Sequence, residues 1–184
     1  AAGLFQRFPV DEVYGMHNQP TGKPGQATIC RGPAMAGASF FDIAVSGKGS
    51  HAAMPHQSRD ALVVASGLVG QFQTVLGRNV APLDRAVLSV TQIHAGSAYN
   101  VVPETAALAG TIRFFRPEVR DLMQSRMRDI CDGMARAFGV AITVEFREIF
   151  DVLLNDEDLT DAWAQAAADV VGQAQVDTES EPFT

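Results

Sequence analysis

Between residues 38 and 147 the spacing of hydrophobic positions changes from two to three or four, and then back to two. Residues 39–46 alternate, with Phe41, Ile43 and Val45 on one face, which is typical of a half-buried strand. After a glycine-containing loop, a stripe at helical spacing predicts a core-facing helix with Ser58 as its N-cap and Gly77 at its end. The stripe consists of Leu62, Ala65, Val69, Phe72 and Leu76.

The following residues repeat the pattern. Residues 86–94 and 106–115 are rich in β-branched and aromatic residues and are predicted to be strands. Pro117 is suited to the first position of a second helix, which Gly139 closes, and Val140 to Phe146 alternate as a fourth strand. The order βαββαβ predicts an α+β fold, a ferredoxin-like sandwich with both helices on one face of the sheet. The open face would carry the alternate residues Asp42, Ser89, Thr91, Thr111, Arg113, Thr143 and Glu145.

The two flanks have a different pattern. Residues 10–17 are interpreted as a short strand that ends at His17, and residues 27–31 as another strand. Near the other end, an amphipathic helix from Leu159 to Val170 follows the acidic cap at 155–158. Because neither flank can bury its apolar face alone, we expect two pieces of one further domain, residues 1–36 and 150–184, with the sandwich at 37–149 inserted between them.

Composition narrows the function classes. Fourteen Lys and Arg against 21 Asp and Glu give a net charge of −7, and the scattered basic residues argue against nucleic acid or an anionic membrane as a partner. The longest uncharged runs, 61–77 and 86–103, are interrupted by polar residues and are too short for a membrane span. Two cysteines, Cys30 and Cys131, form no disulfide framework, so the cytoplasm is the expected compartment.

Two histidines stand out as candidates for chemistry. His17 lies at a predicted strand end, where metal ligands often project, although a surface histidine is the commoner outcome and a metal site needs several donors. His51 lies in the loop GKGSHAAMPH at 47–56, where small neighbours leave room for a ligand around the ring. The alternative for His51 is a solvated loop residue, and His56 and His94 have nothing special around them.

Two further side chains could bind a ligand. Asn100 lies in a loop between two predicted strands, where its amide would either brace the turn or meet a ligand carbonyl. Arg113 on the open sheet face would be either a solvated charge or a clamp for a carboxylate. With His51, these two would form a receptor for an amide and a carboxylate, but their spacing in the sequence does not place them together.

Six ordered motifs together resemble the M20 metallopeptidases, in particular the aminoacylase and amidohydrolase branch with hippurate hydrolases and indole-acetyl-amino-acid hydrolases. The resemblance runs from residue 3 to about 150. The motifs are GLFQRFP at 3–9, GMHN at 15–18, GKGSHAAMPH at 47–56, VTQIH at 90–94, AYNVVP at 98–103 and GTIR at 110–113.

The resemblance implies a function and roles for residues. It implies a two-metal catalytic domain, with zinc or manganese, interrupted by a ferredoxin-like lid through which the protein forms a homodimer. Metal-activated water would cleave the amide of an N-acyl amino acid or small peptide. His17 would be a metal ligand, His51 would stabilise the oxyanion in the partner subunit's site, Asn100 would bind substrate and Arg113 would hold its carboxylate.

Several parts of the family pattern are not in these residues. The family's Cys-Gly-His-Asp-Gly-His-type motif and paired glutamates are expected before residue 1, and its last histidine after residue 184. The acidic pair Asp11-Glu12 does not match the glutamate motif. We therefore expect a fragment of an amidohydrolase that is inactive alone. The alternative is a non-catalytic ferredoxin-like dimerisation or ligand-binding module, and an RNA-binding module of the same strand order is less consistent with the acidic composition.

Overall fold

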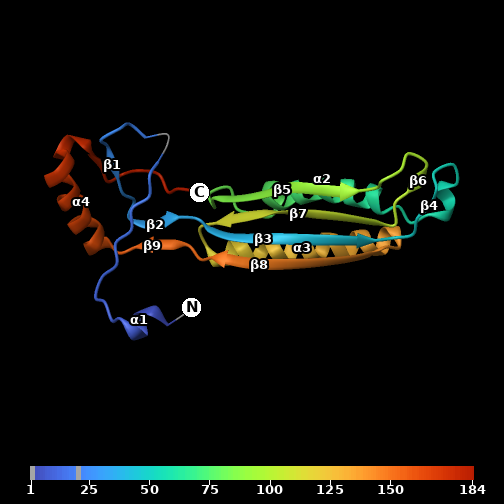
Figure 1. Cartoon of the computed structure of the whole chain (residues 1–184), viewed down its shortest axis with the longest axis horizontal. Coiled ribbons are helices and arrows are strands. Elements are labelled where there is room, and N and C mark those ends of the chain that lie inside the picture. The colour runs from blue at the N-terminus through green and yellow to red at the C-terminus, as the bar shows by residue number, and fades with distance from the viewer. Residues whose placement is uncertain (1–2, 20–21) are drawn as a thin grey trace.

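The main body of the molecule is a four-stranded antiparallel sheet. A computed structural model describes residues 3–19 and 22–184. The sheet has the order β5-β7-β3-β8, built from β3 (Gly37–Ser46), β5 (Ala86–Ala95), β7 (Thr105–Phe114) and β8 (Ala141–Phe150). This is the strand order of the ferredoxin-like sandwich, so the predicted fold class is confirmed. The sheet occupies one end of an elongated molecule, and the residues from the two ends of the chain lie at the other (Figure 1).

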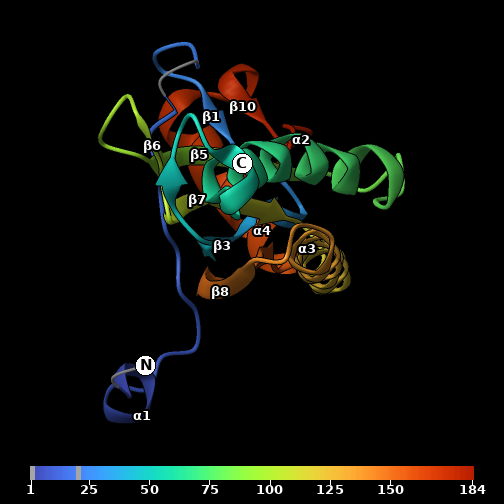
Figure 2. The ribbon, with the colours of Figure 1, turned by 90° about the vertical axis from the view of Figure 1, so that its right-hand side faces the viewer.

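Two helices cover one face of this sheet. They are α2 (Ala61–Arg78) and α3 (Pro117–Phe138), and both lie on the same side of the strands (Figure 2). The core between the two layers contains Phe41, Ile43, Val45, Leu108, Ile112 and Phe114 from the strands, and Leu68, Phe72, Val75, Met123 and Met127 from the helices. The alternate residues, such as Asp42, Thr143 and Glu145, are exposed on the other face, as expected.

The N-cap residue of α2 differs from the predicted one. Asp60, not Ser58, is the N-cap, because its carboxylate accepts hydrogen bonds from the amides of Leu62 (2.9 Å) and Val63 (3.1 Å). The Ser58 hydroxyl instead donates to the carbonyl of Pro55. Leu62 is 42% exposed, and Ala61 is buried in its place. The predicted stripe was therefore partly out of phase at its beginning.

The end of α3 agrees with the prediction. Gly139 adopts the left-handed conformation with φ of 65°, which is the usual geometry of a glycine that terminates a helix.

The two ends of the chain pair with each other beside the sandwich. Strand β1 (Ala27–Thr28) is parallel to β10 (Val176–Asp177), and β2 (Gly32–Met35) is antiparallel to β9 (Leu153–Asn155). Next to them lie α4 (Glu157–Val171), capped by Asp156 as expected, and the short η2 (Gln173–Gln175).

Two strand predictions at the beginning of the chain need correction. The strand predicted at 10–17 is wrong: these residues are irregular and exposed, because no strand in the described part of the chain pairs with them. The strand predicted at 27–31 is present only as β1, and pairing resumes at Gly32, which has a positive φ of 65°. Before this segment, α1 (Leu4–Arg7) is a single helical turn.

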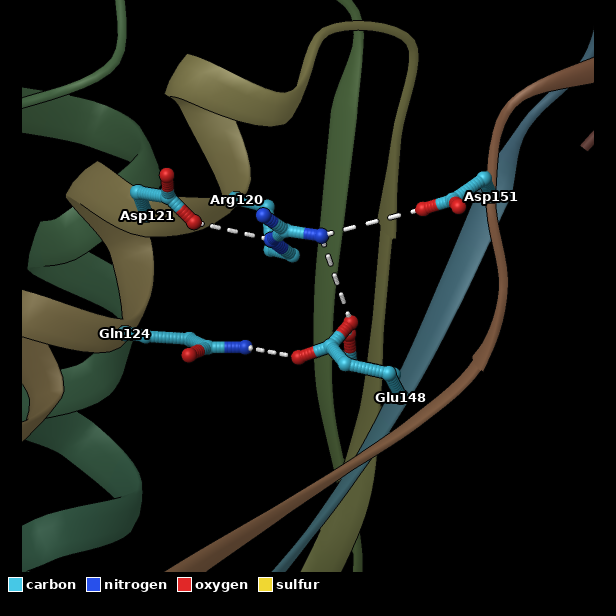
Figure 3. A network of polar contacts seen from close by, with 6 residues as sticks. Arg120, Asp121, Gln124, Glu148 and Asp151 are labelled. Atoms are coloured by element: carbon cyan, nitrogen blue, oxygen red, sulfur yellow. Dashed lines mark hydrogen bonds and ion pairs between the residues drawn. The ribbon is translucent and has the colours of Figure 1, made fainter.

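A polar network fixes the first turns of α3 to the end of β8, where the sheet joins the flanking strands (Figure 3). Glu148 accepts hydrogen bonds from the amide of Gln124 at 2.7 Å and from the buried hydroxyl of Ser39 at 2.6 Å. The Arg120 guanidinium lies 3.6 Å from Glu148 and 3.8 Å from Asp151. These contacts hold α3 and β8 together at the end of the sandwich nearest the flanks.

None of the helices in the described part of the chain combines the length and the hydrophobicity needed to span a bilayer.

Candidate functional site

His51 and Asn100 come together in a small ribbon at the end of the sandwich furthest from the flanking strands, which we call the tip (residues 47–57 and 96–104; Figure 1). The tip contains β4 (Ser50–His51), β6 (Val101–Val102) and the 3-10 turn η1 (Pro55–Gln57). His51 is paired with Val101, and the amide of Ala52 donates to the carbonyl of Asn100 at 2.9 Å. The side chains of His51 and Asn100 are both exposed.

A glycine is required for this ribbon to close. A Cβ atom on Gly49 would lie 2.9 Å from the carbonyl oxygen of Val102, which is closer than real Cβ atoms approach. Gly49 therefore lets β4 approach β6 and so positions His51 beside Asn100.

The imidazole of His51 has a defined tautomer. Its Nδ1 accepts a hydrogen bond from the backbone amide of Ala53, at 3.1 Å. In a neutral imidazole that accepts at Nδ1, the proton is carried by Nε2. The free edge of His51 is consequently a hydrogen-bond donor that faces solvent, which is the property needed to bind a carbonyl oxygen or an oxyanion.

Arg113 lies at the opposite end of the sheet. It is near the end of β7, opposite Ala38 and Val87, while Asn100 precedes the beginning of that strand. Its guanidinium donates to the carbonyl of Ile112 at 3.1 Å and to the hydroxyl of Thr111. Since a strand of this length extends about 30 Å, one small substrate cannot touch Arg113 and the tip of the same chain. The three-residue receptor considered from the sequence does not form within one subunit.

His17 lies among the flanking strands, far from the tip. It is exposed in the irregular segment before β1, and not at a strand end as predicted. Its Nδ1 is 2.7 Å from the carbonyl oxygen of Asn18. Because a carbonyl only accepts, Nδ1 carries the proton and Nε2 keeps its lone pair, which is the tautomer of a histidine that ligates metal through Nε2. The chemistry of this one donor therefore fits a divalent metal ion.

His17 also lines a pocket of about 580 Å³ between the two ends of the chain. Its other walls include Tyr14, Cys30, Trp163, Asp177 and Phe183. Within residues 3–19 and 22–184, however, no three His, Cys, Asp or Glu side chains gather where they could hold a metal ion. His17 is therefore one potential donor in this pocket, whose lining also includes Cys30, Asp177 and Glu181.

Of the remaining candidates, His94 and Glu12 have local partners. His94 lies on β5 with its Nε2 3.4 Å from Gln92, and His56 belongs to η1. Glu12 accepts a hydrogen bond from the hydroxyl of Tyr14 at 2.9 Å, and this contact raises the pKa of Tyr14. One feature that the sequence did not point to is the role of the Ala53 amide, since every residue except proline has such a group.

Comparisons with known proteins identify the family. The model of the peptidase dimerisation domain of M20 proteins matches residues 34–137, which is more than half of the chain. The chain belongs to the M20 family of peptidases and amidohydrolases. The ferredoxin-like sandwich derived above is the dimerisation domain of this family, which confirms the resemblance noted from the six motifs.

Curated relatives of this M20 chain are hydrolases by name. N-acetyldiaminopimelate deacetylase of Streptococcus sanguinis is 42% identical over 146 residues, which cover 79% of this chain and 39% of the relative. Hippurate hydrolase of Campylobacter jejuni is 30% identical over 181 residues, covering 98% of this chain and 47% of the relative. The chain thus spans less than half the length of these relatives.

Solved structures that resemble this chain also belong to longer proteins. A proposed aminohydrolase from methicillin-resistant Staphylococcus aureus superposes with a TM-score of 0.77 at 25% identity, over 89% of this chain and 43% of that protein. A dinuclear metal-binding M20 peptidase from Bacillus subtilis superposes with a TM-score of 0.68 at 28% identity, over 91% of this chain and 41% of that protein. The match covers the sandwich together with most of the flanking residues.

Proposed function

We propose that this chain is part of a metal-dependent amidohydrolase that removes the acyl group from N-acyl amino acids. Relatives that are hydrolases by name support this reaction class. The structural observation that supports it is the orientation of His51 at the tip of the sandwich. There, His51 presents an exposed Nε2–H donor held in orientation by the Ala53 amide. Such a donor suits the negative charge that develops on the carbonyl oxygen of an amide during hydrolysis.

The metal ions of the complete enzyme would be two divalent ions, zinc or manganese, of which His17 would hold one through Nε2. A dinuclear M20 peptidase among the similar structures supports the pair of ions. When bound, the ions would supply a water activated for attack on the amide carbonyl. His17 provides one donor in the correct tautomer, and the remaining ligands and the general base would come from outside residues 1–184.

Substrate binding would involve two further residues. Asn100, held next to His51, would bind the amide of the substrate, and Arg113 would hold its carboxylate. Because Arg113 and the tip lie at opposite ends of β7, they would act on one substrate only if they came from two subunits. The proposed active site is therefore composite, with His51 and Asn100 contributed by the partner in a homodimer.

The proposed division of the chain follows from this function. Residues 37–149 would form the lid and dimerisation domain, and residues 1–36 and 150–184 would form two pieces of the catalytic domain. We further propose that the enzyme acts in the cytoplasm, in agreement with two free cysteines.

The test is an amidohydrolase assay on a protein of the relatives' length that contains this chain, with this chain alone as the second arm. N-acetyl and N-benzoyl amino acids are supplied, and release of the free amino acid is measured before and after chelation and after return of Zn²⁺ or Mn²⁺. We expect metal-dependent release by the longer protein and none by this chain. The absence of any metal-dependent release by the longer protein would favour a non-catalytic dimerisation or ligand-binding module.

A further inference from the structure

The guanidinium of Arg113 lies beside two side chains of neighbouring strands on the open face of the sheet, the face without helices (Figure 2). Arg113 donates to the hydroxyl of Thr111 and to the carbonyl of Ile112 at 3.1 Å, so its side chain turns back along β7. Thr111 is paired with Ser89 on β5 and with Phe40 on β3. Side chains directly opposite each other on neighbouring strands have Cβ atoms about 4.5 to 5.5 Å apart. The Arg113 guanidinium is therefore adjacent to Ser89 and Phe40.

Phe40 is a large apolar side chain on this otherwise largely polar face. Its neighbours along β3, Ser39 and Phe41, are fully buried on the core side, so the Phe40 ring lies on the open face, where it is 37% exposed. Arg147 on β8 is paired with Phe40, and its guanidinium carbon is 5.9 Å from the centre of the ring. The Phe40 ring thus has an arginine on each side and still exposes part of its surface.

The two arginines beside Phe40 differ in their partners. In the described part of the chain, the Arg113 guanidinium contacts neutral groups, namely a hydroxyl and a carbonyl. The Arg147 guanidinium is paired with the carboxylate of Asp42 at 2.9 Å. A carboxylate from a ligand would gain a charge partner at Arg113, but it would have to compete with Asp42 at Arg147. A bound carboxylate is therefore favoured on the Arg113 side of the ring.

We propose that Phe40 contacts the side chain of the amino acid whose carboxylate Arg113 holds, and that it thereby selects N-acyl amino acids with large apolar side chains. The inference rests on the proposed function, in which Arg113 binds the substrate carboxylate. The α-carbon of an amino acid carries both the carboxylate and the side chain, so a carboxylate on Arg113 brings the side chain close to the neighbours of the guanidinium. An apolar side chain that covers the exposed part of the Phe40 ring removes apolar surface from water, which favours binding.

The other side of Arg113 offers less surface to an apolar group. Ser89 is half-buried and polar, and it lies on β5, an outer strand of the sheet, whereas Phe40 lies on β3, an inner strand. Val87 is paired with Arg113 itself. Because the arginine turns back toward Thr111, Val87 is beside its aliphatic part and not beside the guanidinium. The substrate side chain is therefore expected over Phe40.

The test uses a protein of the relatives' length that contains this chain, with N-acetylglycine, N-acetylleucine and N-acetylphenylalanine as substrates. The values of kcat and KM are measured for each substrate with the unmodified protein and with Phe40→Ala, Phe40→Leu and Val87→Ala. Phe138→Ala is the matched control, because Phe138 is similarly exposed, at 44%, but lies at the end of α3 on the opposite side of the sheet. Thermal unfolding and metal analysis verify that each variant is folded and loaded.

We expect the unmodified protein to prefer the two large substrates to N-acetylglycine. Phe40→Ala should lower kcat/KM at least about tenfold for the large substrates and less than about twofold for N-acetylglycine. The loss should appear mainly in KM, since the contact is the same in the bound substrate and in the transition state. Phe40→Leu should keep part of the preference, and Phe138→Ala should keep all of it.

Several results would overturn the inference. One is an equal loss for all three substrates in Phe40→Ala, which would mean that Phe40 only supports the fold or the position of Arg113. Others are an unmodified protein without a preference, and a preference that is lost in Val87→Ala but kept in Phe40→Ala. If the unmodified protein released none of the three amino acids, the proposed function itself would fail, so the two failures are distinguishable.

Discussion

The backbone amide of Ala53 donates a hydrogen bond of 3.1 Å to Nδ1 of His51, so Nε2 of His51 carries the proton. His17 has the reverse arrangement, because its Nδ1 donates to the carbonyl oxygen of Asn18 and leaves the lone pair on Nε2. One imidazole is thus prepared to donate a proton in a hydrogen bond, and the other to bind a cation. Local backbone contacts set these opposite properties before any metal or substrate is present.

The two tautomers can be measured directly. In metal-free protein above the range where imidazole protonates, we expect the nitrogen chemical shifts of His51 to report the proton on Nε2, and those of His17 to report it on Nδ1. Ala53→Pro removes the donor amide and should leave His51 as a mixture of tautomers, with His17 unchanged. A mixture at His51 in the unmodified protein would show that the Ala53 contact does not control the ring.

The proposed role of His51 predicts a large loss of activity in the complete enzyme. Removal of one donor to an oxyanion typically lowers the rate by about 10² to 10³, or about 3 to 4 kcal/mol in the barrier. His51→Ala should therefore lower kcat by this factor while the fold and the metal content are retained. The measurement is kcat at saturating substrate, with bound metal determined in the same samples.

His56→Ala is the matched control, since His56 lies in the same tip but belongs to η1 rather than to the ribbon with Asn100. We expect it to change kcat little. If His51→Ala retained the activity of the unmodified enzyme, His51 would be only a structural residue of the loop.

The sandwich could be predicted from the sequence because its strands and helices each have one buried face. The alternation at Phe41, Ile43 and Val45 and the spacing along α3 follow from burial against a single core. Helix starts depend on finer contacts: Ser58 and Asp60 are both good capping residues, and only the path of the chain decides that Asp60 faces the free amides of α2. The sequence pattern of residues 10–17 resembled that of a strand, but such a pattern does not supply a partner strand, and in the structure these residues are irregular and exposed.

The site was predictable in its residue types but not in its arrangement. The loop around His51 was notable for its small residues, and the structure brings it to Asn100 through the pairing of β4 with β6. No spacing rule in the sequence indicates that Arg113 lies far from His51 and Asn100. The distance between Arg113 and Asn100 is large because β7, which separates them, is extended throughout. The pocket around His17 joins residues more than 130 positions apart, and such contacts leave no local pattern.

Two glycines of the sandwich should respond in opposite ways to substitution by alanine. A Cβ on Gly110, in the middle of β7, would overlap the carbonyl oxygen of Ser89 and the buried ring of Phe41. Gly110→Ala should therefore lower the free energy of unfolding by about 2 kcal/mol or more. On α3, Gly133 has no neighbouring atom within 4 Å of the added Cβ, so Gly133→Ala should stabilise by about 0.5 to 1 kcal/mol. Urea denaturation of both variants checks the two signs, and equal effects would contradict the packing around Gly110.

The buried thiol of Cys131 predicts a loss of stability at high pH. Burial in the core, and to a lesser degree the charge of Asp132, raises the pKa of Cys131 from 9.0 to about 12. Above pH 9.0 the unfolded chain releases this proton while the folded chain retains it up to about pH 12. The unfolded state is therefore favoured increasingly as the pH rises, by about 1.4 kcal/mol for each pH unit in this window. Below pH 9.0 both states keep the proton, and Cys131 adds no pH dependence.

Cys131→Ala isolates this contribution, because all other titrating groups are shared by the two proteins. The variant should be less stable by a constant amount at neutral pH, owing to the small cavity left in the core. The gap between the two free energies of unfolding should then narrow as the pH is raised above 9.0, since only the unmodified chain has a thiol whose proton the unfolded state releases while the folded state retains it. Urea denaturation at a series of pH values measures this gap. A gap that stayed constant through that range would mean that the Cys131 thiol reaches solvent and titrates normally in the folded protein.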